Sequence, residues 1–502
     1  MAAVYDEYTR DRVGMFFGLT GAQLTTLVVA GVPALWAFRQ EEWGLLAGFI
    51  LLWVAVLGMV AVPIRGRSAI GWMVAAAAHA SGTVLRWTRW RSKASKGQVD
   101  DLAEPDLPGV LQSVTVHDGP PQGPTNTRFA VIQDHAGRVW AATAAVTHPG
   151  LALADAAERD SQGRGLSTLL NACARTELIS EVLFMIRSVP EDGAEREQWL
   201  ARHRSPAAPA LATLVNEQMA ATLSQASVRT EAFCTIVVPE DRLAKEAKEF
   251  GRGVDARARA MAMLMAEVEG HLRTGLRMSS VEWLTSPQLA AAVRTGFAPG
   301  DRAGIVEALA AREADPAVNA SVPWAQAGPS GADLVVRHYA HDAWHSISAT
   351  VKLPAKGAVL GALAPVLVPT EPGERRSMVT VFPILAQSTA DKQVQSAEWA
   401  ADMGEGLRAR AGMKTRAKDR TAVARTRGLD AKLASGNAMV RPYAVACVTV
   451  PKTQRIAEFG RRLDASIRRA GFAPLRLDLS QDAGFAAANI PLGLGLHRKS
   501  EQ

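Results

Sequence analysis

Cysteine is scarce in this chain, with only Cys173, Cys234 and Cys447 in 502 residues. The three positions lie far apart, and none forms the C-x-x-C spacing that zinc ribbons and redox motifs use. A sparse, odd set of this kind excludes a disulfide framework. It is typical of reduced cysteines with a structural role.

The motifs of several common enzyme classes are also missing. No G-x-x-x-x-G-K-[S/T] loop is present, and the Lys-Thr and Lys-Ser pairs lack the glycines that let backbone N–H groups surround a phosphate. The sequence contains no G-x-S-x-G, H-E-x-x-H or G-x-G-x-x-G element. We therefore expect a protein that is not an enzyme and that holds no metal or cofactor.

One histidine cluster, His338, His341 and His345, tests that expectation. On a strand His341 and His345 would share a face and His338 would point the other way, while on a helix His341 and His345 would stand one turn apart. No acidic residue or cysteine follows at the spacing of a further zinc ligand. The cluster favours polar surface histidines over a zinc site.

Charged residues are absent from two long stretches near the N-terminus. TGAQLTTLVVAGVPALWAF covers residues 20–38, and WGLLAGFILLWVAVLGMVAVPI covers residues 43–64. As a helix, each is long enough to cross a hydrocarbon core of about 30 Å. The charged residues before the first stretch exclude a secretory signal peptide. The two stretches predict a transmembrane hairpin closed by residues 39–42.

Cations flank this hairpin mainly on the side of its two open ends. The positive-inside rule therefore predicts that both termini are cytoplasmic and that the protein lies in the cytoplasmic (inner) membrane. Tryptophan and basic side chains favour the membrane interface, and basic ones attract anionic lipid. The expected interface anchors are Trp36, Trp43, Arg65, Arg67, Trp87, Arg89, Trp90, Arg91 and Lys93.

The rest of the chain alternates strand-like and helix-like segments and predicts mixed α+β domains made of strand–helix–strand units with helical insertions. Runs at 110–116, 128–133 and 138–146, the first two separated by the proline-rich PPQGP, predict an antiparallel meander. Further strands are expected at 178–189, 229–238, 334–353 (a strand pair), 377–385, 443–450 and 474–479. Helices are expected at 68–90, 151–174, 191–203, 209–225, 254–276, 354–367 and 454–470. In the helix at 209–225, one face is apolar, formed by Leu211, Leu214, Val215, Met219 and Leu223.

These patterns divide the chain into four parts. We expect the hairpin at 1–66, a juxtamembrane helix and linker at 67–108, a first cytoplasmic domain at 109–228 and a second at 229–502.

Residues 396–434 form a long basic segment with helical character. Phosphate neutralisation on a nucleic acid and docking on an acidic protein partner are both consistent with it, as is a solvated helix face. The segment lacks the aromatic residues on which single-stranded bases stack, which disfavours that mode of binding. The candidate contact residues are Arg408, Arg410, Arg416, Arg420 and Arg425.

Two parts of the sequence resemble known families. YTRDRVGMFFGLTGAQL, at residues 8–24, resembles the start of PrgI-like proteins, small two-span components of conjugation systems. The region from Trp344 to Pro365, RRSMVTVFPIL at 375–385, and the stretch that begins ASGNAMVRPYAVACVTVPKTQRIAEFG at 434 are similar to the region before the motor domain in VirB-type secretion ATPases. The missing phosphate loop means that no ATP-binding residue is carried over.

The resemblance implies a non-catalytic membrane subunit of an actinobacterial type IV secretion or conjugation system. Its expected partners are a separate VirB-type ATPase and other secretion-complex subunits, within an oligomeric assembly. An EccE-like membrane component of type VII secretion, which also has two N-terminal spans and a cytoplasmic domain, is the alternative. A membrane-tethered DNA-binding protein that uses the basic segment is a third hypothesis.

Overall fold

The structure is a computed structural model that describes residues 4–5, 21–61, 63–64, 67–98, 101–122, 126–150, 154–226, 228–352, 358–387, 389–392, 428 and 432–496. The chain separates into two compact units. The larger unit contains residues 1–5, 89–396 and 416–502, and the smaller contains residues 6–88 and 397–415.

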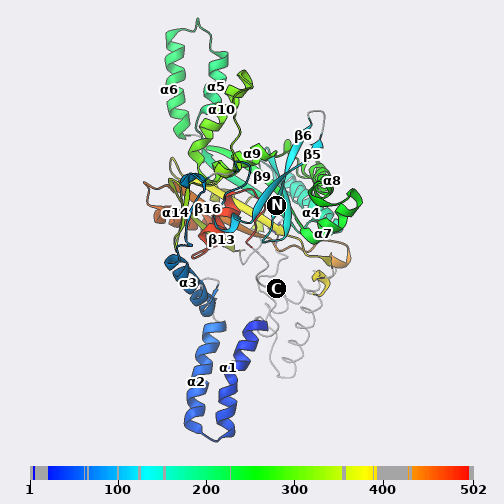
Figure 1. The fold of residues 1–502 in the computed structure, drawn as a ribbon, viewed down its shortest axis with the longest axis vertical. Coiled ribbons are helices and arrows are strands. Elements are labelled where there is room, and N and C mark those ends of the chain that lie inside the picture. The colour runs from blue at the N-terminus through cyan, green and yellow to red at the C-terminus, as the bar shows by residue number, and fades with distance from the viewer. Residues whose placement is uncertain are drawn as a thin grey trace. The chain divides into compact units, whose positions relative to one another are not determined.

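The smaller unit contains a pair of helices, α1 (Gly21–Arg39) and α2 (Trp43–Ala61), drawn in blue in Figure 1. They pack against each other, and the Trp53 indole N–H donates to the carbonyl oxygen of Leu27 at 2.9 Å. A short strand pair, β2 (Pro63–Ile64) and β3 (Arg67–Ser68), leads into α3 (Ala69–Val84). The predicted helical hairpin is thus confirmed as a pair of helices. Within the described part of the chain, no helix combines the length and the apolar character that crossing a membrane requires.

The larger unit is built on one antiparallel sheet. In the described residues thirteen strands join in the order β4-β11-β12-β13-β16-β15-β8-β9-β7-β6-β5, with β10 beside β7 and β17 beside β13. The strands are β4 (Arg89–Arg91), β5 (Val114–Gln122), β6 (Thr127–Asp134), β7 (Val139–Thr147), β8 (Glu181–Pro190), β9 (Val228–Pro239), β10 (Ser280–Trp283), β11 (Gly331–Leu334), β12 (Tyr339–His341), β13 (Trp344–Lys352), β15 (Arg375–Pro383), β16 (Tyr443–Pro451) and β17 (Ala473–Arg476). A separate pair joins β1 (Val4–Tyr5) to β14 (Ala358–Val359).

Helices cover both faces of the sheet. One face packs against α9 (Ser286–Phe297), α11 (Trp324–Ala327) and α15 (Gln481–Asn489). On the other face, α4 (Ala156–Thr176), α7 (Glu240–Glu246) and α8 (Gly253–Thr274) cover the strands from β6 to β9, while α14 (Ile456–Arg469) covers β13 and β16. Three further α-helices of this unit are α5 (Ala194–His203), α6 (Ala210–Ala226) and α10 (Arg302–Ala314). Short 3-10 turns are η1 (Ala94–Lys96), η2 (Gly109–Leu111), η3 (Ala247–Phe250), η4 (Pro299–Asp301) and η5 (Ala364–Val366).

Local sequence explains where α9 and α4 begin and how α4 meets α8. Thr285 and Gln288 form a reciprocal capping box before α9, and the Asp155 carboxylate accepts the Glu158 N–H at the start of α4. Helices α4 and α8 approach so closely that a Cβ at Gly165 would lie 2.0 Å from the Gly275 carbonyl oxygen. Glycine at position 165 therefore permits the packing of the two helices.

The α+β class and the β5–β6–β7 meander are confirmed. The expected strand at 110–116 begins only at Val114, and β5 continues through Pro120 and Pro121, which were predicted to separate two strands. A register shift lies between Asp118 and Pro121, and β5 is the last strand of the sheet path. Proline is tolerated on an edge strand because its missing N–H removes no hydrogen bond inside the sheet.

The helix expected at 354–367 is wrong, since the described part of that range contains β14 and η5. Gly361 has a φ of 87°, outside the helical region, and Pro365 cannot continue a helix. The segment predicted as a linker contains η1, and β4 just before it pairs with β11 at the sheet edge. The strand pair expected at 334–353 is confirmed as β12 and β13, and β11 ends at Leu334, where that range begins. Strands β8 and β9, on either side of the expected boundary at 228/229, are neighbours in the same sheet.

Candidate interaction site

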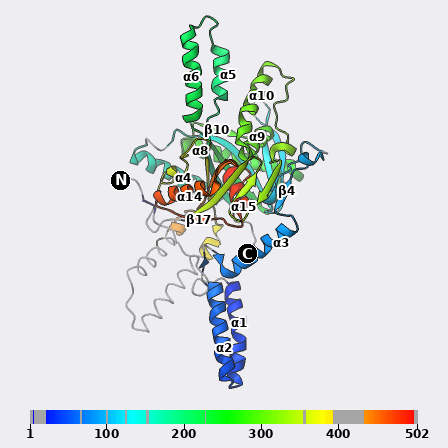
Figure 2. The ribbon, with the colours of Figure 1, turned by 90° about the vertical axis from the view of Figure 1, so that its left-hand side faces the viewer.

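Three helices, α5, α6 and α10, extend from one side of the sheet (Figures 1 and 2), and we call them the arm. The Arg196 side chain on α5 donates to the carbonyl oxygen of Asn216 on α6 at 3.2 Å. Helix α5 also contacts α10, where the Gln198 amide donates to the Val306 carbonyl oxygen at 2.9 Å. No residue of α5 is buried, and on α10 only Arg302 is. The arm therefore has almost no core of its own.

Helix α6 turns its larger apolar side chains toward solvent. The exposed fractions are 70% for Leu211, 49% for Leu214, 44% for Val215 and 47% for Met219. These residues recur at the i, i+3, i+4 and i+8 positions of one helix face, and we call this the α6 face. The only charged residue of α6 is Glu217. An uncharged apolar stripe left open to solvent is typical of a surface that contacts another protein.

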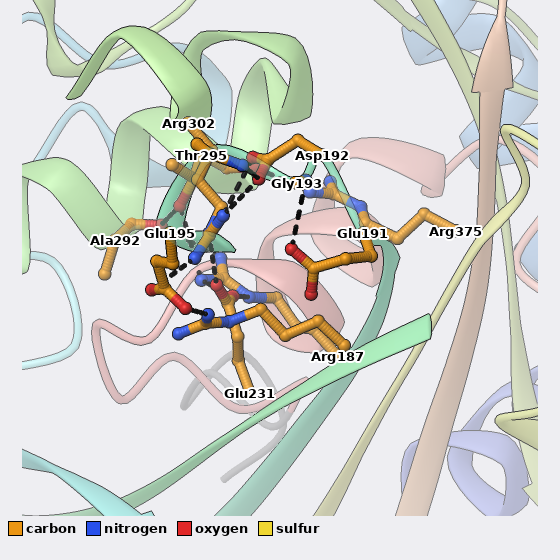
Figure 3. Close-up of polar contacts among 12 residues, drawn as sticks. Arg187, Glu191, Asp192, Gly193, Glu195, Glu231, Ala292, Thr295, Arg302 and Arg375 are labelled. Carbon is orange, nitrogen blue, oxygen red and sulfur yellow. Dashed lines mark hydrogen bonds and ion pairs between the residues drawn. The ribbon is translucent and has the colours of Figure 1, made fainter. Parts of the chain in front are cut away.

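A cluster of charged side chains holds the base of the arm (Figure 3). Arg302, the first residue of α10, is only 8% exposed. Its guanidinium contacts both carboxylate oxygens of Asp192 at 2.7 and 2.8 Å and donates to Glu195 at 2.8 Å. Arg229, at the start of β9, donates to the other oxygen of Glu195 at 2.5 Å. These contacts connect the beginnings of α5, α10 and β9.

Beneath Arg302 lies a second ion pair inside the sheet. Arg187 on β8 and Glu231 on β9 face each other in register, and Arg187 donates to one Glu231 oxygen at 3.0 and 2.7 Å. The same guanidinium donates to the carbonyl oxygens of Ala292, in the C-terminal half of α9, and of Asn489, the last residue of α15. Carbonyl groups at a helix C-terminus carry partial negative charge and therefore stabilise this buried cation.

Arg375 on β15 extends this arrangement without a carboxylate of its own. It is 1% exposed, and its guanidinium donates to the carbonyl oxygens of Thr295, at 2.6 Å, and Gly296. Burial, and then the neighbouring charge of Arg187, lower the pKa of Arg375 to about 9. The C-terminal end of α9 thus receives two arginines, Arg187 and Arg375.

The pKa shifts of Glu231 and Arg302 both favour the charged form of the side chain. Burial alone would raise the pKa of Glu231, but the charge and hydrogen bonds of Arg187, with Arg375 and Arg229, lower it below its usual value. Burial would lower the pKa of Arg302, but Asp192, Glu195 and Glu231 raise it. The base cluster, as we call it, consists of seven residues: Arg187, Asp192, Glu195, Arg229, Glu231, Arg302 and Arg375. Its charges are paired with one another or with helix ends, which suits a structural clamp rather than acid–base chemistry.

The histidines at 338–345 are arranged differently from the sequence prediction. His338 and His345 lie together, with ring centroids 4.8 Å apart, because β12 and β13 form a tight antiparallel pair. His341 is fully buried, and its Nε2 lies 2.8 Å from the Ser346 hydroxyl, which contacts Thr449 at 2.7 Å. Burial lowers the pKa of His341 well below its usual value. A histidine–serine pair with no exposed surface has no route to a substrate and serves as a polar contact inside the core.

Across the described residues, no group of three or more histidine, cysteine or acidic side chains is placed to hold a metal ion. A shallow pocket of about 430 Å³ lies beside the sheet edge and is lined by Ser92, Ser95, Arg294, Asp301 and Ser330 among others. Arg294 is already paired with Asp301 at 2.6 Å and donates to the Gly328 carbonyl oxygen at 2.6 Å. The guanidinium of Arg294 is therefore occupied by these two partners and offers no free charge to a ligand in the pocket.

The predicted interface anchors fall into three groups. Trp36, Trp43 and Trp87 are exposed. Arg89, Trp90 and Arg91 form β4, where Trp90 packs against the core and Arg91 pairs with Asp333 at 2.8 Å, and the exposed Lys93 follows them. Arg65 lies outside the described residues, as do Arg408, Arg410, Arg416, Arg420 and Arg425, and the side chain of Arg67 is not described.

No model of a protein family matches the chain, and no curated protein sequence matches it.

Sequence reasoning did not identify the arm or the base cluster. The apolar positions of α6 were visible as a helical stripe, but a stripe alone does not tell a buried face from an exposed one. The base cluster joins residues that are more than one hundred positions apart, such as Asp192 and Arg302.

Proposed function

We propose that this protein is a non-catalytic structural subunit of a type IV-like conjugative secretion system in the cytoplasmic membrane. The α1–α2 hairpin anchors the chain, and the arm docks a separate secretion ATPase. The observation that carries the proposal is the pair of exposed apolar surfaces, one on the hairpin and one on the α6 face. The resemblance to PrgI-like and VirB-type proteins supplies the biological setting. An EccE-like role in type VII secretion is the alternative.

The side chains of the hairpin support a membrane anchor. Leu35, Leu51, Leu52 and Val54 are all more than half exposed although they are strongly apolar. Each described helix has 19 residues, or about 28 Å of rise, slightly less than a hydrocarbon core of about 30 Å, and the uncharged run that contains α2 continues to residue 64. Lipid chains would cover this surface at no cost in unpaired backbone groups, because a helix satisfies its own hydrogen bonds.

We expect the full chain to remain in the membrane pellet after extraction with alkaline carbonate or high salt. The double variant Leu51→Arg/Val54→Arg places two cations on the α2 surface, each costing about 3 kcal/mol in a bilayer, and should leave the pellet. Leu102→Arg, at a position that is 53% exposed outside the hairpin, is the matched control and should stay bound. Release of the unmodified protein by carbonate would contradict the anchor.

The α6 face supports docking because it is apolar, nearly uncharged and uncovered. We expect affinity purification of the full chain from its own host to recover a VirB-type ATPase. Leu214→Glu/Val215→Glu should reduce that recovery at least about tenfold, since central apolar contacts dominate such interfaces. Glu217→Lys changes charge on another side of α6 and should not reduce it. Unchanged recovery with the double variant would reject docking through the arm, and recovery of type VII components would favour the alternative.

A further inference from the structure

We propose that the outer face of α14 binds the anionic headgroups of a phospholipid bilayer. This inference rests on the proposed membrane anchor, which holds the larger unit near such a surface. Helix α14 belongs to a different part of the larger unit from the arm. The inference is carried by the placement of charge on α14.

Helix α14 is amphipathic. Its apolar side packs on β13 and β16 through Phe459, Leu463 and Ile467, each at most 3% exposed. Figure 2 labels the helix on the sheet beside β17. Its opposite side is exposed along the whole length of the helix. The packing therefore fixes which residues of α14 remain available to a partner.

That exposed side is basic because the acids near it are already paired. Glu458 binds Arg462 at 2.7 Å, and Asp464 binds Arg476 at 2.9 Å. The exposed arginines of the outer face, which we call the α14 face, are Arg455, Arg461, Arg468 and Arg469. Among the residues that the structure describes, none of these four has an ion-pair partner.

The stability of the helix itself does not account for this pattern. Arg468 and Arg469 lie in the last turn, where cations interact favourably with the helix dipole. Arg455 occupies the N-cap, where a cation opposes the dipole, and the exposed Lys452 lies three residues earlier. Basic residues therefore lie at both ends of the exposed face, and their charge is complementary to an anionic partner.

The form of the face favours a lipid surface over a nucleic acid. No exposed aromatic side chain accompanies the arginines on α14, so stacking with bases is not available. Planar guanidinium groups bind the phosphates of lipid headgroups in two-point contacts and need no aromatic neighbour to do so. A tether to the same membrane also raises the effective concentration of headgroups at this face. Anionic lipid is therefore the partner that the charges and the anchor together favour.

The experiment measures how close α14 lies to the bilayer in the full chain. The three native cysteines are buried, so a fluorescent donor can be attached selectively through Ala465→Cys, at an exposed position of α14. The labelled chain is placed in vesicles of phosphatidylcholine with or without phosphatidylglycerol, with an acceptor dye on the lipid headgroups. We expect energy transfer to rise at least about twofold with phosphatidylglycerol and to fall back in high salt.

Charge reversal identifies the residues responsible. Arg461→Glu/Arg468→Glu/Arg469→Glu should abolish the rise with phosphatidylglycerol. Lys245→Glu/Lys248→Glu/Arg252→Glu makes the same change of charge at exposed positions elsewhere and should retain it. Equal energy transfer in both lipids overturns the proposal, as does an equal loss in both triple variants.

Flotation of the same vesicles separates the two proposals. A chain that floats with both lipids but shows no lipid-dependent transfer keeps the anchor and rejects the α14 face. A chain that floats only with phosphatidylglycerol, and loses this in the α14 variant, rejects the anchor and supports the α14 face. Binding to duplex DNA that depends on the α14 arginines, without a lipid effect, overturns the proposal in favour of a nucleic acid.

Discussion

Arg302→Met is expected to reduce the free energy of unfolding of the larger unit by about 3–5 kcal/mol. Arg302 contacts Asp192 and Glu195 and lies 3.9 Å from Glu231. Removing Arg302 leaves the Asp192 carboxylate, which is 24% exposed, without its cation, and an uncompensated charge in a largely buried site costs more than the pair contributed. The change should appear as a lower midpoint of urea unfolding and as faster hydrogen exchange in β8, β9 and α5.

The matched control is Arg202→Met, further out on the same arm. Arg202 pairs with Glu313 at 2.7 Å, but the side chains are 56% and 69% exposed. An exposed pair of this kind contributes no more than about 1 kcal/mol, so the midpoint should move little. Equal effects of the two substitutions would mean that the base cluster does not hold the arm.

Much of the large unit could be predicted from periodicity. The apolar runs of β6, β7, β9 and β16 identify strands, because their residues are buried on both faces of the sheet. Helices α8 and α14 follow the same rule with a period near 3.6. The helix predicted at 354–367 was wrong, since Gly361 and Pro365 outweighed the apolar residues around them.

The candidate site could not be predicted for a different reason. The base cluster depends on which strands become neighbours, and strand order is a tertiary property. Arg187 meets Glu231 only because β8 pairs with β9, and Arg375 meets Thr295 only because α9 lies across β15. The exposure of Leu211 likewise depends on tertiary packing, because no other described element covers that face of α6.

The arm and its base have complementary physical properties. The exposed helices lack a core and gain little from their own packing, whereas the base cluster fixes the first turns of α5 and α10 with several charge-assisted hydrogen bonds. A docking element benefits from this combination because its free state is already oriented and less conformational entropy is lost on binding. The arrangement is consistent with the proposed docking role.

Glu181, at the start of β8, provides a second large effect, one that depends on pH. The segment around Gly495 covers the Glu181 side chain. A Cβ at Gly495 would lie 3.0 Å from a carboxylate oxygen of Glu181. The nearby Tyr443 hydroxyl accepts the N–H of Leu496 at 2.9 Å. Burial raises the pKa of Glu181 from 4.5 to about 7. The folded state therefore favours the protonated carboxyl.

Because the pKa of Glu181 is raised in the folded state, the free energy of unfolding depends on pH. Between about pH 4.5 and 7 the folded chain holds a proton that the unfolded chain has released, so the contribution of Glu181 to stability falls as the pH rises through this range. Above pH 7 the cost of the buried charge is complete, at about 3 kcal/mol. Glu181→Gln keeps the shape without the charge. We expect it to raise the free energy of unfolding at pH 8 by that amount and to change it little at pH 4.5.

The measurement is urea unfolding of the unmodified chain and of Glu181→Gln at several pH values, read as the difference between the two. Glu249→Gln, at an exposed position on η3, is the control and should not reproduce the stabilisation that Glu181→Gln shows at pH 8. The other carboxylates are common to both chains and cancel in the difference. A constant difference for Glu181→Gln would contradict the raised pKa, because a buried carboxylate that stays ionised through this range must have a compensating cation.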